Sequence, residues 1–165
     1  MIKVIFLDID GVLNVMSQER DDYGSLFHKH FEDNLRLIIE KTSAKIVISS
    51  TWRFDGLTKM KEMWKFRDLP GEVISITPNE VQVVNRGYCE FYDLVKRGHE
   101  IQLWLEDNPV DNYVILDDDT DMLESQMSNY VRCSDNKHHE DCVDIGYGLT
   151  KQCALKAIGI LNRLN

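Results

Sequence analysis

The sequence of 165 residues predicts an α/β fold in which a mostly parallel central sheet lies between two layers of helices. Three segments of strand length, 2–7, 45–50 and 112–119, are almost continuously apolar before their polar ends, as is typical of strands buried on both faces. Stretches with a helical period separate them, which indicates parallel strands joined by right-handed crossovers. The three strands lead into the polar sequences DID, SSTWR and DDDTD.

The other elements follow in chain order. The first helix is predicted around an apolar face formed by Phe31, Leu35, Ile38 and Ile39. Weaker strands are expected at 72–77 and 129–133, and a second helix runs through EIQLWLEDN and ends before Pro109. Thr150 is the expected N-cap of the last helix. The residues that this helix is predicted to bury are Ala154, Leu155, Ala157, Ile158, Leu161 and Leu164.

Length and composition predict one domain over 1–165, with a small irregular insert at about 54–96. The formal net charge of −9 argues against a broad nucleic-acid-binding face, which needs basic residues. No apolar run approaches membrane-spanning length, and the chain opens directly on a strand, so we expect a cytoplasmic protein without a membrane partner. The cysteines Cys89, Cys133, Cys142 and Cys153 are expected to be reduced thiols.

Acidic side chains follow the first and third of the main strands. Asp8 and Asp10 are two residues apart on a strand and therefore point the same way. Parallel strands end at one edge of a sheet, so two of Asp117, Asp118, Asp119 and Asp121 are expected beside them. A hard divalent cation, Mg²⁺, suits such an all-oxygen cluster.

With its charge neutralised, Asp8 is a candidate nucleophile and Asp10 a candidate proton donor and acceptor. A hydroxyl such as Ser50 and a cation such as Arg97 would neutralise the phosphoryl oxygens. The Asp-Gly pair and the aspartate cluster each also have a purely structural interpretation. Asp-Gly pairs are common in turns, and clustered aspartates often begin helices.

The segment FLDIDGVLN resembles motif I, DxDGx, of the haloacid dehalogenase (HAD) superfamily. The resemblance implies a Rossmann-like three-layer fold, Mg²⁺, and an aspartyl-phosphate intermediate. Asp8 matches the nucleophile and Asp10 the general acid/base, and both are expected at the metal. The segment KIVISS resembles motif II, which implies that Ser50 binds phosphate, with Ser49 and Thr51 as alternatives.

The segment VILDDD resembles motif IV and implies that Asp117 and Asp118 are the acidic metal-binding pair, with Asp121 as an alternative second member. Asp118 is the better candidate for direct ligation. Motif III of the family is a cation at the start of the preceding helix. Arg97 is the chosen candidate because guanidinium can bind phosphate with two hydrogen bonds, and the rivals are Lys96, Arg86 and Arg53.

A finer resemblance rests on SSTWR, RGHEIQLWL, DDDTDM and GYGLT, which are similar to HAD domains of bacterial and phage multi-domain RNA-repair proteins. It implies removal of phosphate from nucleotides or nucleic-acid ends. Trp52 and Arg53 are then candidates to stack on and pair with the substrate, and the alternative is a core tryptophan with a salt-bridged arginine. Only about 35 residues separate motifs I and II, which predicts a minimal cap and an open site.

The sequence therefore predicts a Mg²⁺-dependent phosphatase with a small phosphorylated substrate. The alternatives are a nucleotidase or polynucleotide end phosphatase, and a non-catalytic module that binds metal and phosphate. Zinc ligands are also concentrated at Cys133, His138, His139 and Cys142. Their spacing matches no familiar zinc pattern, and the charged residues between them favour an exposed loop.

Overall fold

The computed structural model of the protein describes residues 2–15, 17–133 and 147–163. Its main sheet has five strands in the order β5-β4-β1-β6-β7, and every neighbouring pair is parallel. These strands are β1 (Lys3–Leu7), β4 (Lys45–Ile48), β5 (Val73–Ile76), β6 (Asn112–Asp117) and β7 (Tyr130–Arg132). A separate antiparallel hairpin joins β2 (Arg20–Asp21) to β3 (Gly24–Ser25). The predicted α/β class and parallel sheet are confirmed.

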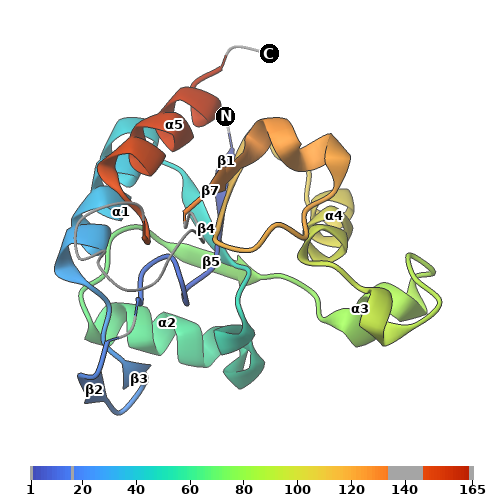
Figure 1. The fold of residues 1–165 in the computed structure, drawn as a ribbon, viewed down its shortest axis with the longest axis horizontal. Coiled ribbons are helices and arrows are strands. Elements are labelled where there is room, and N and C mark those ends of the chain that lie inside the picture. Colours follow the sequence, from blue (N-terminus) through green and yellow to red (C-terminus); the bar gives the residue numbers. More distant parts are fainter. Residues whose placement is uncertain (1, 16, 134–146, 164–165) are drawn as a thin grey trace.

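Five α-helices are present in the described part of the chain. They are α1 (Lys29–Thr42), α2 (Gly56–Phe66), α3 (Glu80–Asn85), α4 (Arg97–Asp107) and α5 (Lys151–Leu161). Three short 3₁₀ helices are η1 (Thr51–Asp55), η2 (Tyr92–Leu94) and η3 (Glu124–Asn129). Helices α1 and α5 pack side by side, and α4 lies across the sheet from them (Figure 1).

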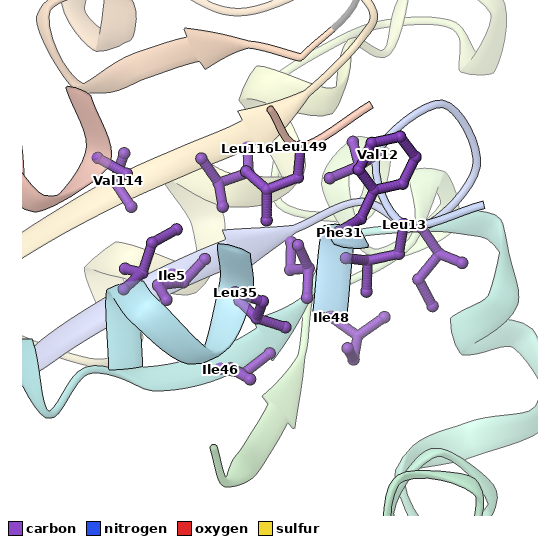
Figure 2. Packing of buried hydrophobic residues seen from close by; sticks show 14 of the residues in the cluster. Ile5, Val12, Leu13, Phe31, Leu35, Ile46, Ile48, Val114, Leu116 and Leu149 are labelled. Atoms are coloured by element: carbon purple, nitrogen blue, oxygen red, sulfur yellow. The ribbon is translucent and has the colours of Figure 1, made fainter. Parts of the chain in front are cut away.

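The alternation of side chains along β1 divides the core into two layers. Ile5 and Leu7 point into the cluster formed with α1, α2 and α5, part of which Figure 2 shows. Val4 and Phe6 point into the opposite cluster with α4, where the rings of Phe6 and Trp104 meet edge to face at 5.3 Å. Because β1 is buried on both faces, a continuous apolar segment is the sequence that its position requires.

The last helix, α5, begins at the predicted N-cap, but one of the residues predicted to be buried in it is exposed. The Thr150 hydroxyl accepts a hydrogen bond from the Cys153 N–H at 3.2 Å, which is the expected N-cap. Leu155 was expected in the core but is 56% exposed, since it lies on the outer face of α5. Leu164 lies outside the described residues.

The region 54–96 is more regular than the small insert that the sequence analysis expected. It supplies α2 to one helical layer and β5 to an edge of the main sheet. Only α3, η2 and the chain around them project from the layers (Figure 1). No helix was predicted at α2, although its buried residues Met60, Met63 and Trp64 recur at helical spacing.

Cys89, Cys133 and Cys153 are free thiols, as expected, and Cys142 lies outside the described residues. Most of the proposed zinc grouping, namely His138, His139 and Cys142, lies outside them too. No helix in the described ranges is long and apolar enough to cross a membrane.

Gly148 provides a test of the packing between the last loop and α1. Its φ is +74°, and a Cβ there would lie 2.4 Å from the Phe31 ring. We expect Gly148→Ala to lower the free energy of unfolding by ~2–3 kcal/mol, through backbone strain and overpacking. Thermal or urea unfolding measures this change.

The matched control is Gly159, which lies exposed within α5 where an added Cβ would meet nothing within 4 Å. Gly159→Ala should raise the free energy of unfolding by up to ~1 kcal/mol through helix propensity. Equal effects of the two substitutions would contradict the packing described at Gly148.

Candidate active site

The carboxyl ends of three neighbouring strands form the site. β1 lies between β4 and β6, and the ladder continues past its end, since the Asp8 N–H donates to the Leu116 carbonyl at 3.0 Å. On the other side, the Ser49 N–H donates to the Leu7 carbonyl at 2.9 Å. Asp8, Ser49–Ser50 and Asp117 are thereby brought to one edge of the sheet, as the sequence predicted.

Three carboxylates gather at this edge. Asp8, Asp117 and Asp118 each offer an oxygen, and these atoms all lie within 4.8 Å of one another. Asp8 and Asp117 are buried, and Asp118 is half-buried. Within the described chain, Asp117 Oδ2 is buried and accepts no hydrogen bond. An oxygen-only set with an unsatisfied buried oxygen fits a hard divalent cation.

Gly11 is required for this grouping. Its φ is +76°, a conformation that glycine adopts readily. A Cβ on Gly11 would lie 2.2 Å from the Asp118 carboxylate, so the glycine also gives Asp118 its space. The Gly of the DG pair therefore serves both the turn and the acidic cluster.

Burial dominates the electrostatics of the acidic cluster. It raises the pKa of Asp8 above its usual range, although a hydrogen bond from the Ser50 hydroxyl and the charge of Arg97 oppose the shift. Burial together with the negative charge of Asp8 raises the pKa of Asp117 further. The pKa of Asp118 is also raised, by burial and by the neighbouring Asp119. All three shifts favour the protonated carboxyl groups, and burial is the main cause of each.

Asp10 lies at the rim, outside the group of three. Its side chain is exposed, and Oδ1 accepts a hydrogen bond from Asn14 Nδ2 at 2.9 Å. Oδ2 accepts one from Trp52 Nε1 at 2.8 Å. The sequence analysis expected Asp10 among the metal ligands, but the structure does not bring its carboxylate into the grouping of Asp8, Asp117 and Asp118. The bonds from Asn14 and Trp52 hold both carboxylate oxygens of Asp10 in place beside a hollow of about 400 Å³.

Trp52 packs against the hydrophobic core and also reaches the edge of the site. Its ring packs against Phe27, with the ring centroids 5.7 Å apart, and its side chain is half-buried. The indole N–H is directed at Asp10, so Trp52 contacts the site through a hydrogen bond. Its contact with a substrate stays a prediction.

Ser50 and Thr51 occupy different environments. Ser50 is 1% exposed, and its hydroxyl bonds to Asp8, whereas Thr51 is exposed at the start of η1. Ser49 is also buried, and its hydroxyl has no hydrogen-bond partner in the described chain. Of the three candidate phosphate ligands, Thr51 is thus open to solvent, while Ser50 is the one in contact with the predicted nucleophile.

Arg97 is the candidate cation that reaches the acidic cluster. Its Nε lies 3.7 Å from Asp117 Oδ2, and the backbone N–H of Arg97 donates to Asp121 Oδ2 at 2.8 Å. Asp121 is therefore engaged with the start of α4. Lys96 is exposed at the N-cap of α4. Arg86 is paired with Asp107 at 2.8 Å on the surface and belongs to a different part of the molecule.

The structure favours one of the two interpretations of Arg53. It was a candidate to pair with the substrate, but it is 5% exposed and its Nη2 lies 2.5 Å from Glu100 Oε1. The salt-bridged alternative describes it. The sequence analysis did not identify Glu100 or Asn14 as part of the site. Glu100 could have been found, because it follows Arg97 by three residues and so lies on the same face of a helix.

Comparison with known families agrees with this geometry. Residues 4–138 match the family described as "HAD domain in Swiss Army Knife RNA repair proteins". The match covers most of the chain, from the first residues of β1 past the end of β7. No curated protein matches the sequence. The chain is thus a member of the HAD hydrolase superfamily and belongs to the family of HAD domains of Swiss Army Knife RNA repair proteins.

Proposed function

We propose that this protein is a Mg²⁺-dependent phosphatase that cleaves phosphomonoesters through an aspartyl-phosphate on Asp8. The observation that carries the proposal is the grouping of Asp8, Asp117 and Asp118 within 4.8 Å beside the Arg97 guanidinium. Phosphoryl transfer requires mainly positioning and neutralisation of negative charge, and this edge of the sheet supplies residues for both.

The donor set supports a single divalent cation. Asp8, Asp117 and Asp118 would hold it, and the unsatisfied Asp117 Oδ2 is a suitable ligand atom. Together with Arg53, Arg97 and Glu100 these residues comprise four carboxylates and two guanidinium groups, a formal net charge of −2. One Mg²⁺ would neutralise that charge and draw electron density from a phosphate oxygen.

The chain's own groups divide the remaining work. An oxygen of Asp8 would form a bond to phosphorus as the ester P–O bond breaks, and Arg97 would bind the equatorial oxygens together with Ser50 or Thr51. Asp10 would give a proton to the departing oxygen and later take one from the water that hydrolyses the aspartyl-phosphate. The hollow beside Asp10 supports this role, since the leaving group needs space there.

The substrate is proposed to be a small phosphorylated compound. The second candidate, a phosphorylated nucleotide or nucleic-acid end, is favoured by the RNA-repair family to which the chain belongs. The net charge of −9 favours recognition of a terminus over recognition of a long duplex. A third candidate, a non-catalytic module, would bind metal and phosphate without turnover.

We expect Asp8→Asn to lower kcat for p-nitrophenyl phosphate by about 10³-fold or more, because the amide cannot attack phosphorus. Asp33→Asn, on the exposed face of α1, is the control and should retain the wild-type rate. Equal rates for wild type and Asp8→Asn in Mg²⁺ would reject the enzyme and favour the non-catalytic module.

Metal binding should be visible in the dependence of stability on pH. The raised pKa values of Asp8 and Asp117 mean that the metal-free fold favours their protonated forms. The contribution of these two groups to the free energy of unfolding is complete below the pKa of an unfolded aspartate. It is lost as the pH rises through the raised pKa values of the folded state. We therefore expect the Tm of the metal-free protein to fall between about pH 5 and about pH 8.

Mg²⁺ should raise the Tm more at the higher pH, because it binds the ionised carboxylates. Asp117→Asn should flatten the pH dependence and remove most of the Mg²⁺ effect. Thermal unfolding with and without Mg²⁺ measures both. A Tm of the metal-free wild type that rises over this range would contradict the proposed cluster.

The substrate candidates separate by assay of mononucleotides, 5′- and 3′-phosphorylated oligonucleotides, and small phosphate esters. If nucleic-acid ends are the substrate, kcat/KM for an oligonucleotide should exceed that for p-nitrophenyl phosphate by at least about 100-fold, from contacts beyond the phosphoryl group. Similar values across the panel would support the small-substrate candidate.

A further inference from the structure

Glu100 lies between two arginines at the phosphate side of the site. Its Oε1 is 2.5 Å from Arg53 Nη2, and its Oε2 is 3.0 Å from Arg97 Nη1. All three side chains are shielded from solvent, with exposed fractions of 7% for Glu100, 4% for Arg53 and 16% for Arg97. Each oxygen of the carboxylate is therefore committed to a different guanidinium.

Arg53 connects the Glu100 carboxylate to the residues that follow β4. Its Nη1 donates to the Ser50 carbonyl at 2.8 Å, and the Ser50 hydroxyl bonds to Asp8. A continuous set of polar contacts thus runs from Asp8 through Ser50, Arg53 and Glu100 to Arg97. It joins the two segments that are candidates to bind the phosphoryl group.

The geometry at Arg97 shows what Glu100 prevents. Arg97 Nε is 3.7 Å from Asp117 Oδ2, which is too long for a hydrogen bond, whereas Nη1 is bonded to Glu100. Without Glu100, the guanidinium is free to close on Asp117 and occupy the carboxylate that the metal needs. With Glu100 in place, Arg97 keeps N–H groups available for phosphate oxygens.

Stability alone gives no reason for this arrangement. A buried ion pair loses most of its Coulombic gain to desolvation, and apolar residues of the same volume often stabilise a core as well or better. The positions of Arg53 and Glu100 are explained instead by what they do to Arg97.

We propose that Glu100 and Arg53 are a positioning pair that fixes the Arg97 guanidinium for the phosphoryl group and keeps it from closing on Asp117. This inference rests on the proposed phosphatase function and assigns a role to two residues that do not themselves touch the substrate. Arg53 prevents Glu100 from turning both oxygens to Arg97, and Glu100 prevents Arg97 from pairing with Asp117.

The test compares Glu100→Gln and Arg53→Met with wild type in saturating Mg²⁺. We measure kcat and KM for p-nitrophenyl phosphate, and the inhibition constant of inorganic phosphate. Both variants should raise KM and the phosphate inhibition constant by about tenfold, the effect of about one charge-assisted hydrogen bond. Arg53→Met leaves Glu100 and Arg97 as a balanced ion pair, so it remains informative if Glu100→Gln folds poorly.

The matched control is the exposed ion pair of Arg86 and Asp107, which lies away from the site. Its Nη2 and Oδ1 atoms are 2.8 Å apart, so it has the same chemistry as the buried pair. Arg86→Met and Asp107→Asn should leave all three constants unchanged. A merely structural role for Glu100 would reduce the fraction of active molecules, which lowers kcat and leaves KM and the phosphate inhibition constant as they are. That pattern, or constants within about twofold of wild type in both site variants, overturns the proposal.

Calorimetric titration with inorganic phosphate in Mg²⁺ separates this inference from the proposed function. Turnover by wild type together with unchanged phosphate affinity in both site variants overturns the positioning pair alone. A wild-type protein that neither hydrolyses p-nitrophenyl phosphate nor binds phosphate overturns both. Binding without turnover, weakened about tenfold in both variants, supports the positioning pair and rejects the phosphatase.

Discussion

The rest of the site depends on one electrostatic constraint, which is that ionised carboxylates cannot be buried together without positive charge among them. Asp8 and Asp117 are held at the ends of adjacent strands by the backbone ladder, so they cannot move apart without breaking the sheet. The positive charge must therefore come to them. Arg97 supplies part of it from the start of α4, and burial keeps the pKa values of both carboxyl groups raised although the charge of Arg97 lowers them.

This constraint also orders the polar groups farther out. The guanidinium that approaches the cluster must be kept from neutralising it completely, and the carboxylate of Glu100 divides its two oxygens between Arg97 and Arg53. Asp10 is held by Asn14 and Trp52 and is not part of the buried group of Asp8, Asp117 and Asp118. The acidic residues of the DID motif thus have different environments although they are two positions apart. One is buried among charges, and the other is oriented at the surface.

Much of this architecture follows from local sequence. The strands that carry the site are continuous apolar segments, and the parallel topology brings their polar ends to one edge regardless of the distance along the chain. The glutamate that joins two arginines was not predicted, because the partner Arg53 comes from a 3₁₀ turn whose direction no period specifies. The sequence left Arg53 with two interpretations, substrate pairing and a salt bridge, and it wrongly placed Leu155 of α5 in the core. Residue type and spacing indicate which groups meet at a strand end, but side-chain direction beyond it depends on tertiary packing.

The central place of β1 in the sheet has a consequence for how such a domain diversifies. Asp8 follows a strand with neighbours on both sides and helices over both faces, so its position tolerates little variation. The β2–β3 hairpin and the projecting chain around α3 are not part of the main sheet, and both lie outside its layers (Figure 1). Evolution or laboratory selection can therefore remodel these peripheral segments to accept new molecules while the reactive centre is inherited intact.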